Sequence, residues 1–120
     1  MKKIKAIKID CYRNIVDEVM INAADFEEIN RAIGCDCFCV GARLPQGDIL
    51  WVDDEGWINP KVTRAFQFGT SNSTFAGNGL ILGQTASGNS TNAKSKLLDV
   101  AMNVTFMPTG NCITDEMRAE

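Results

Sequence analysis

Hydrophobic and polar residues alternate with different periods along the chain, and these periods predict where its strands and helices lie. Ile7, Ile9 and Cys11 alternate with polar residues, which is the period of two expected for a strand with one exposed face. The apolar residues before Ile7 fall on the opposite face, so we predict that this strand either begins near Ala6 or carries an irregularity there. Its lysines suit an edge position, because positive charge discourages unwanted strand pairing. Residues 15–21 are predicted to form a second strand.

The period then lengthens to that of a helix. Asp25 suits the N-cap, and Glu28 three positions later completes a pair that resembles a capping box. Apolar residues recur at helical spacing as far as Ile33, and Gly34 provides a C-terminal stop. We therefore predict a helix over about residues 25–33.

A hairpin and a second, shorter helix are predicted next. Proline and glycine within residues 45–48 favour a tight turn between strands at residues 35–44 and 49–52. After a turn at residues 53–56, Trp57 and Ile58 begin a short strand. Asn59 and Pro60 then suit the cap and first residue of a short helix over about residues 60–66.

The rest of the chain has weaker patterns. A short buried strand is predicted at residues 80–82, followed by a mobile polar loop at about residues 84–96. Residues 98–106 alternate as in a strand, although their apolar residues would also suit one face of a helix. From about residue 114 the chain is predicted to be a frayed helix or a tail.

Length and composition agree with a small globular protein. With 120 residues, against roughly 100–200 residues per domain, we predict one domain over residues 1–120. Its class is α+β, with mostly antiparallel strands. The hydrophobic fraction of 45% and charged fraction of 22% exclude general disorder. No apolar run approaches the roughly 18 residues of a membrane span, and lysines interrupt the apolar residues at the N-terminus. We therefore expect a cytoplasmic protein with no membrane partner.

The chain contains no histidine, which excludes Ser-His, Cys-His and His-metal mechanisms. Three consecutive acidic residues begin at Asp53, but acids in a turn before glycine are more often solvated than bound to Mg²⁺. No nucleophile and base are paired by a known motif. We therefore predict that the protein is not an enzyme, with no catalytic residue, no metal site and no cofactor.

Five cysteines are present, and their odd number indicates reduced thiols rather than a disulfide framework. Cys35, Cys37 and Cys39 form C-x-C-x-C, which is not the C-x-x-C spacing of common zinc sites. On a strand this spacing places three thiols on one face, where packing is expected in preference to metal binding. The sequence leaves the role of these cysteines open.

The net charge of −3 is distributed unevenly. Residues 1–60 hold seven Lys/Arg and eleven Asp/Glu, whereas residues 61–120 hold five and four. Residues 61–98, which we call the acid-free segment, contain no carboxylate side chain and could face an anion or simply form a polar loop. The sequence pI of about 4.9 opposes nucleic-acid binding.

One set of side chains could form a binding pocket for a small nucleotide-like anion, with an aromatic ring, amides and a guanidinium group. Each also has a structural interpretation as a core or solvated residue. The candidate ligand-binding residues are Arg43, Trp57, Asn59, Thr63, Arg64 and Asn78.

Several motifs carry a resemblance to a known family. The run R-L-P-x-G-D-x-L-W-V-D-D-E-G covers residues 43–56, and F-A-G-x-G-L-I-L-G covers residues 75–83. Together with K-A-I-K-I-D at residues 5–10, these motifs resemble a small domain family of unknown function found in bacterial, plasmid and bacteriophage genomes. The resemblance spans about residues 3–84, and the cysteines at residues 35–39 depart from its pattern.

The phage setting implied by this resemblance suggests a role in counter-defence. The expectation is non-catalytic binding and sequestration of a nucleotide-derived signalling molecule in the bacterial host cytoplasm, by a homo-oligomer. The alternative is an acidic protein-interaction module that docks the hairpin around residues 53–55 on a basic host protein.

Overall fold

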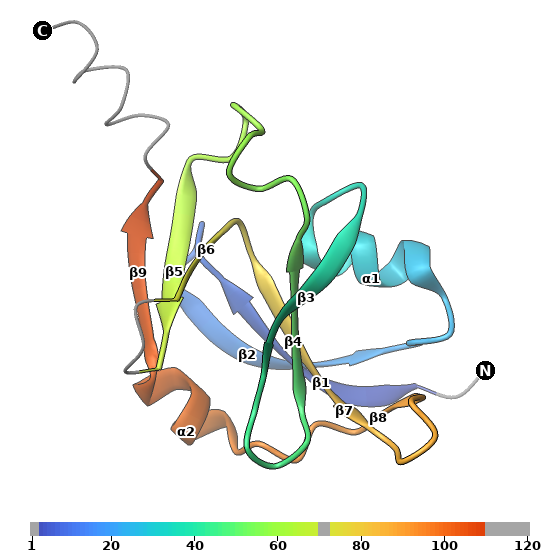
Figure 1. Ribbon diagram of the computed structural model, residues 1–120. Coiled ribbons are helices and arrows are strands. Elements are labelled where there is room, and N and C mark those ends of the chain that lie inside the picture. The colour runs from blue at the N-terminus through green and yellow to red at the C-terminus, as the bar shows by residue number, and fades with distance from the viewer. Residues whose placement is uncertain (1–2, 70–72, 110–120) are drawn as a thin grey trace, which may run out of the picture.

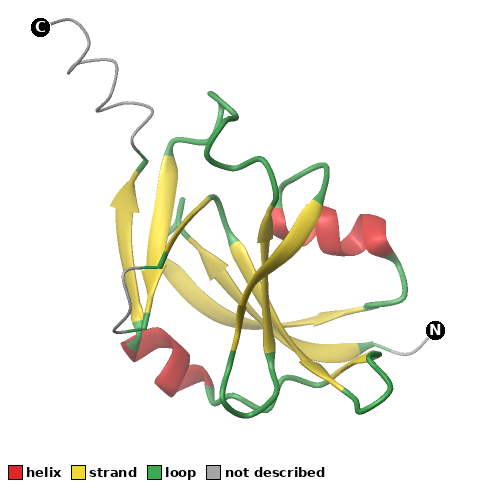
Figure 2. Cartoon of the chain, viewed as in Figure 1, coloured by secondary structure: helices red, strands yellow, loops and turns green. Residues whose placement is uncertain are grey.

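Two antiparallel sheets organise the computed structural model, which describes residues 3–69 and 73–109 (Figures 1 and 2). The larger sheet has the strand order β2-β1-β7-β4-β3, and β8 pairs with β7. The smaller sheet has the order β6-β5-β9. The strands are β1 Ile4–Asp10, β2 Ile15–Ile21, β3 Phe38–Arg43, β4 Ile49–Asp53, β5 Arg64–Phe68, β6 Thr74–Ala76, β7 Gly79–Gln84, β8 Ser90–Thr91 and β9 Val104–Pro108. The helices are α1 Phe26–Ile33 and α2 Leu97–Met102.

The larger sheet is covered on both faces. On one face, Ile7 and Ile81 belong to a buried cluster with Phe66 of the smaller sheet and Val100 of α2. On the other face, a second buried cluster includes Ile29 and Ile33 of α1 together with apolar residues of β1 and β7. Figure 1 shows α1 on one side of this sheet and the smaller sheet on the other. The predicted α+β class with mostly antiparallel strands is confirmed.

The predicted helix at residues 25–33 is confirmed together with both of its caps. The Asp25 side chain accepts hydrogen bonds from the backbone N–H groups of Glu27 at 3.0 Å and Glu28 at 3.4 Å. Gly34 ends the helix in the left-handed region, with φ of 85°. The Glu28 carboxylate accepts from the backbone N–H of Asn22 at 2.6 Å, so it fixes the chain that enters the helix.

The predicted edge position of the first strand is wrong. β1 lies between β2 and β7 and begins at Ile4 rather than near Ala6. Ile4 and Ala6 face α1, whereas Ile7 and Ile9 face the smaller sheet, so both sides of the strand are buried. The apparent break in its alternation therefore reflects two apolar faces and not an irregular backbone.

The predicted short helix at residues 60–66 is also wrong. Residues 60–61 form a turn, and β5 begins at Arg64 and pairs with both β6 and β9. Phe66 is fully buried in the cluster between the sheets, and pairing with a distant strand overrides the local helical signal. Trp57 and Ile58 lie in a turn and not in the predicted strand.

The remaining predictions are confirmed in part. Both strands of the predicted hairpin form, although β3 begins at Phe38 and not at Cys35. The strand predicted at residues 80–82 is the centre of β7. Residues 97–102 form α2, so the strand prediction for residues 98–106 is correct only for its last part, in β9. The predicted frayed C-terminus lies outside the described residues.

The predicted polar loop at residues 84–96 has a defined path. It includes β8, and Ala93 donates its backbone N–H to the backbone oxygen of Lys5 at 2.9 Å. The mobility of this loop stays a prediction. In the part of the chain that the structure describes, no helix is long and apolar enough to cross a membrane.

Candidate functional site

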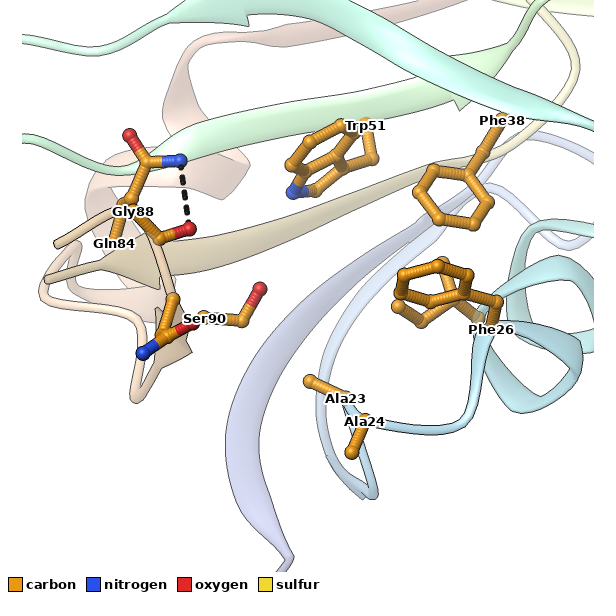
Figure 3. A pocket seen from close by; sticks show the side chains of 10 residues that line it. Ala23, Ala24, Phe26, Phe38, Trp51, Gln84, Gly88 and Ser90 are labelled. Carbon is orange, nitrogen blue, oxygen red and sulfur yellow. Dashed lines mark hydrogen bonds between the residues drawn. The ribbon is translucent and has the colours of Figure 1, made fainter.

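A pocket of about 580 Å³ lies between α1, the β3–β4 pair and the turn that joins β7 to β8 (Figure 3). We call it the aromatic pocket. Its lining residues are Ala23, Ala24, Phe26, Ile29, Phe38, Trp51, Gln84, Gly88, Asn89 and Ser90. Figure 3 shows aromatic rings on one side of the pocket and the polar β7–β8 hairpin on the other.

Three aromatic rings form the first wall. The Phe38 ring meets the Phe26 ring edge-on, with centroids 5.8 Å apart and an interplanar angle of 80°. It meets the Trp51 ring in the same way, at 5.4 Å and 88°. Phe38 and Trp51 share a face of the larger sheet, whereas Phe26 is the first residue of α1 and is 66% exposed. The wall is thus fixed by the sheet at one end and open to solvent at the other.

Amide and hydroxyl groups of the β7–β8 hairpin form the second wall. The turn is held by the Thr85 backbone N–H, which donates to the Asn89 oxygen at 2.8 Å, and by Gly88 N–H, which donates to the Thr85 oxygen at 2.9 Å. The Gln84 side-chain amide donates to the Gly88 oxygen at 3.5 Å, near the limit of a hydrogen bond. This hairpin is part of the acid-free segment.

The indole nitrogen of Trp51 is the one buried side-chain N or O atom among residues 3–69 and 73–109 that has no hydrogen-bond partner. A buried donor without a partner costs about 1–3 kcal/mol. Figure 3 shows this nitrogen on the side of the indole that faces the hairpin. A ligand acceptor that reached this nitrogen, which is closed to solvent in this structure, would relieve this cost.

None of the ten lining side chains carries a charge. The nearest charged residues along the chain, Asp25 and Glu27, are acidic and flank Phe26. No residue of 79–91 is charged. The pocket therefore suits an uncharged, planar group more than an anionic one.

Three of the six candidate ligand-binding residues from the sequence meet around the turn between β1 and β2. Arg64 donates from Nε to the Cys11 backbone oxygen at 3.1 Å and from its terminal nitrogen to Asn14 Oδ1 at 3.0 Å. Asn78 Oδ1 accepts from the Cys11 backbone N–H at 2.9 Å and from the Cys11 thiol at 3.2 Å. The Thr63 backbone N–H donates to the Tyr12 hydroxyl at 3.4 Å. These contacts hold the turn against the smaller sheet.

The other three candidates lie in the segment between β4 and β5 and at the end of β3. Asn59 Oδ1 accepts from the Lys61 backbone N–H at 3.0 Å, and Trp57 is 49% exposed in the preceding turn. Arg43 lies at the end of β3 that pairs with Ile49. The turns that carry Trp57 and Asn59 follow Asp53, at the opposite end of the β3–β4 pair. None of the six lines the aromatic pocket, and their role in ligand binding stays a prediction.

Replacing Arg64 with alanine is expected to lower the free energy of unfolding by about 1–2 kcal/mol, because two hydrogen bonds of a charged group are lost. Urea denaturation of the purified variant measures this change. The matched control is Arg43→Ala on the exposed end of β3, with an expected change of less than about 0.5 kcal/mol. Equal stability of the two variants would show that the Arg64 contacts are not structural.

The described cysteines do not form the predicted one-sided row of thiols. Only Cys39 lies in β3, where it packs on the cluster between the sheets, whereas Cys35 packs on the cluster beneath α1 and Cys37 is exposed. The structure places no group of three or more Cys, Asp or Glu side chains within residues 3–69 and 73–109 where they could hold a metal ion.

Burial raises the pKa of three of these thiols. It raises the pKa of Cys35 to about 12, with a further contribution from Asp53, and that of Cys11 to about 11, with one from Asp10. The pKa of Cys39 rises to about 11, first through burial and then through a hydrogen bond with Asp54. At neutral pH these thiols are protonated and are poor nucleophiles.

Comparison with known proteins places the chain in one family. Residues 4–103 match the family described as a domain of unknown function (DUF3846). No curated protein and no solved structure matches the chain. The resemblance to a small family of unknown function is confirmed, whereas its phage setting stays a prediction. The chain therefore belongs to the DUF3846 family, whose function is unknown.

Proposed function

We propose that the protein binds a nucleotide-derived signalling molecule through its base, without catalysis, and thereby sequesters it. The observation that carries this proposal is the aromatic pocket, in which three rings face a polar hairpin beside the unpaired Trp51 indole nitrogen. A nucleobase has apolar faces that lie against aromatic rings and an edge that accepts and donates hydrogen bonds.

The size of the pocket supports a ligand of this class. Its volume of about 580 Å³ falls within the roughly 300–1,000 Å³ that is usual for small-molecule sites. Such sites are lined mostly by apolar and aromatic groups, with a few polar groups that fix the orientation of the ligand. Gln84, Asn89 and Ser90 are those polar groups here.

Binding without catalysis is supported by the chemistry of the lining. None of the ten lining side chains titrates near neutral pH, so the pocket offers no general acid or base of its own. The raised pKa values of Cys11, Cys35 and Cys39 leave these thiols in their unreactive form.

Sequestration in the host cytoplasm, as phage counter-defence, is the biological role that we propose for this binding. Tight retention needs a dry site, whereas Phe26 leaves one side of the aromatic wall exposed. A second copy of the chain would cover it, so we expect a homo-oligomer.

Titration with a panel of nucleosides, nucleotides and cyclic nucleotides tests the proposal. The variant Trp57→Phe removes the exposed tryptophan, so that the fluorescence of Trp51 alone reports on the pocket. We expect saturable quenching and a higher melting temperature, since ligand at 100 times Kd stabilises the folded state by about 2.7 kcal/mol. Heat denaturation of the complex should then release the ligand intact.

Two outcomes would contradict the proposal. The absence of quenching and of thermal stabilisation across the panel would exclude binding of this ligand class. Recovery of a cleaved product after denaturation would establish an enzyme.

The alternative function, an acidic protein-interaction module, is favoured by one surface. Asp54 and Glu55 are exposed on a turn that also carries Trp57 and Ile58, which are 49% and 77% exposed. Exposed apolar side chains beside acidic ones suit a basic protein partner. A host protein whose co-purification is lost in Trp57→Ala, while nucleotides fail to bind, would establish this function instead.

A further inference from the structure

We infer that the aromatic pocket recognises the uncharged base and not the phosphate groups of its ligand, with Trp51 and Gln84 as the residues that determine specificity. This inference rests on the proposed function, because it names the part of the ligand that the same pocket reads. A nucleoside alone should therefore bind to the pocket, because the phosphates of a nucleotide contribute little to its affinity.

The indole donor of Trp51 is held in a fixed place by strand pairing and ring packing. Trp51 of β4 pairs with Leu80 of β7, and the indole ring packs edge-on against the Phe38 ring. The nitrogen is unpartnered and closed to solvent, so a ligand edge that displaces the neighbouring side chains gains a hydrogen bond that no described residue offers. A site with a fixed donor discriminates strongly against ligands that lack the matching acceptor.

Gln84 lies on the same face of the larger sheet as Trp51. Leu80 pairs with Trp51, and Gln84 is four residues further along the alternating strand β7. The side-chain amide is held only by the 3.5 Å contact with the Gly88 oxygen, which a ligand can replace at little cost. A free amide carries one acceptor and two donors, a set that matches the edge of a base.

The described part of the pocket wall carries no positive charge. No lysine or arginine is among the ten lining residues. The backbone N–H groups of Glu27 and Glu28 at the start of α1 are already bound by the Asp25 carboxylate. This helix terminus is therefore occupied by its own acid, which would repel a phosphate.

The experiment is calorimetric titration of the full chain with the four common nucleosides and with the 5′-mono- and triphosphates of each. We expect one nucleoside to bind most tightly, and its phosphorylated forms to bind within about threefold of it. The affinity of the nucleoside should change less than twofold between 50 and 500 mM salt, because no ion pair is formed.

Two variants test the named residues. Trp51→Phe keeps a ring but removes the donor, and Gln84→Ala removes the amide, so each is expected to weaken nucleoside binding about tenfold. The matched control is Asn103→Ala, which removes an exposed amide at the end of α2, outside the lining, and should leave affinity unchanged. Thermal melting of each variant without ligand shows whether it is folded.

The outcomes separate this inference from the proposed function. Affinity that rises tenfold or more with each added phosphate, with no response to Gln84→Ala, overturns the inference but keeps nucleotide binding. The absence of binding by every nucleoside and nucleotide overturns both. Equal nucleoside affinity in the wild type and in both folded variants overturns the assignment of Trp51 and Gln84.

Discussion

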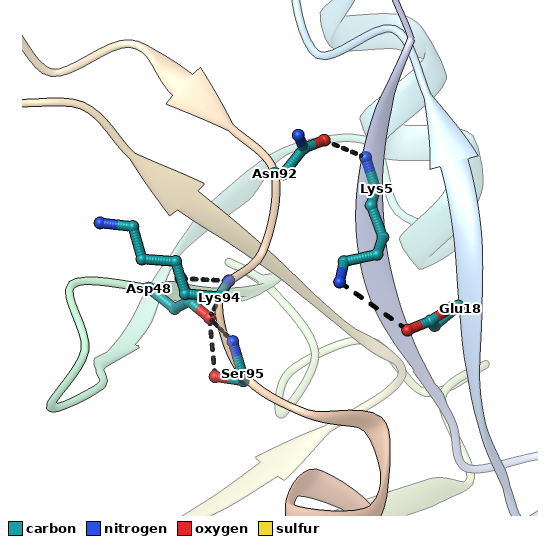
Figure 4. A network of polar contacts seen from close by, with 6 residues as sticks. All are labelled: Lys5, Glu18, Asp48, Asn92, Lys94 and Ser95. Atoms are coloured by element: carbon teal, nitrogen blue, oxygen red, sulfur yellow. Dashed lines mark hydrogen bonds and ion pairs between the residues drawn. The ribbon is translucent and has the colours of Figure 1, made fainter.

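Replacing Asp48 with alanine is expected to lower the free energy of unfolding by about 3–4 kcal/mol, which is a large fraction of the stability of a small domain. The Asp48 side chain is completely buried. Its carboxylate accepts from the Lys94 backbone N–H at 3.0 Å, from the Ser95 backbone N–H at 2.7 Å and from the Ser95 hydroxyl at 2.6 Å (Figure 4). Alanine would leave the two backbone donors without their acceptor and the Ser95 hydroxyl with only Gln46 Oε1, at 3.3 Å.

The size of this effect follows from the place of Asp48 in the fold. Its backbone oxygen accepts from the Leu44 N–H at 2.8 Å and so closes the turn between β3 and β4. Its side chain connects that turn to residues 94–95, which lead from β8 to α2. Loss of the carboxylate therefore detaches a segment that crosses the end of the larger sheet (Figure 4).

Urea denaturation measures the loss, and two further variants show its origin. Asp48→Asn keeps the shape but replaces one acceptor oxygen with a donor, so about 2 kcal/mol should be lost. Ser95→Ala removes a single hydroxyl and should cost about 1 kcal/mol. If Asp48→Ala lies within about 0.5 kcal/mol of the wild type, the buried carboxylate does not hold this segment.

The elements that were predictable from the sequence are those whose signals are local. The cap at Asp25, the stop at Gly34 and the turn at residues 45–48 each depend on neighbours a few positions away, and all three form as expected. The helix prediction for residues 60–66 is wrong because the strand character of β5 depends on its partners, among them the distant β9, whose pairing brings Phe66 opposite Phe106. That distance along the chain leaves no local pattern.

The same limit explains the candidate site. Phe26, Phe38, Trp51 and Gln84 come from four elements, and only the order of strands brings them together. A half-buried tryptophan with an unpaired nitrogen has no signature in sequence. Residues 84–90 of the acid-free segment contribute one wall of the pocket, and the role of this segment in facing an anion stays a prediction. Its lack of carboxylates, however, does not create a cationic surface there.

Gly83→Ala is expected to destabilise the protein by about 2–3 kcal/mol and to weaken ligand binding in the aromatic pocket. A Cβ atom at Gly83 would lie 2.2 Å from the backbone oxygen of Asn92, far inside van der Waals contact. Asn92 cannot move away freely, because its side-chain oxygen accepts a hydrogen bond from the Lys5 backbone N–H at 2.8 Å. The strain would instead separate β8 from β7, where Gly83 pairs with Thr91.

Separation of β8 from β7 would change the pocket directly. Gln84 and Ser90 pair with each other across these two strands, and both belong to the polar wall. Thermal melting and nucleoside titration of the same variant measure both effects. The matched control is Gly47→Ala, in a turn away from the pocket, where φ is +91° and a Cβ meets no atom within 4 Å. There the cost is backbone strain alone, about 1 kcal/mol, with unchanged ligand affinity. If the two variants have equal stability and equal affinity, the close approach at Gly83 does not position the hairpin wall.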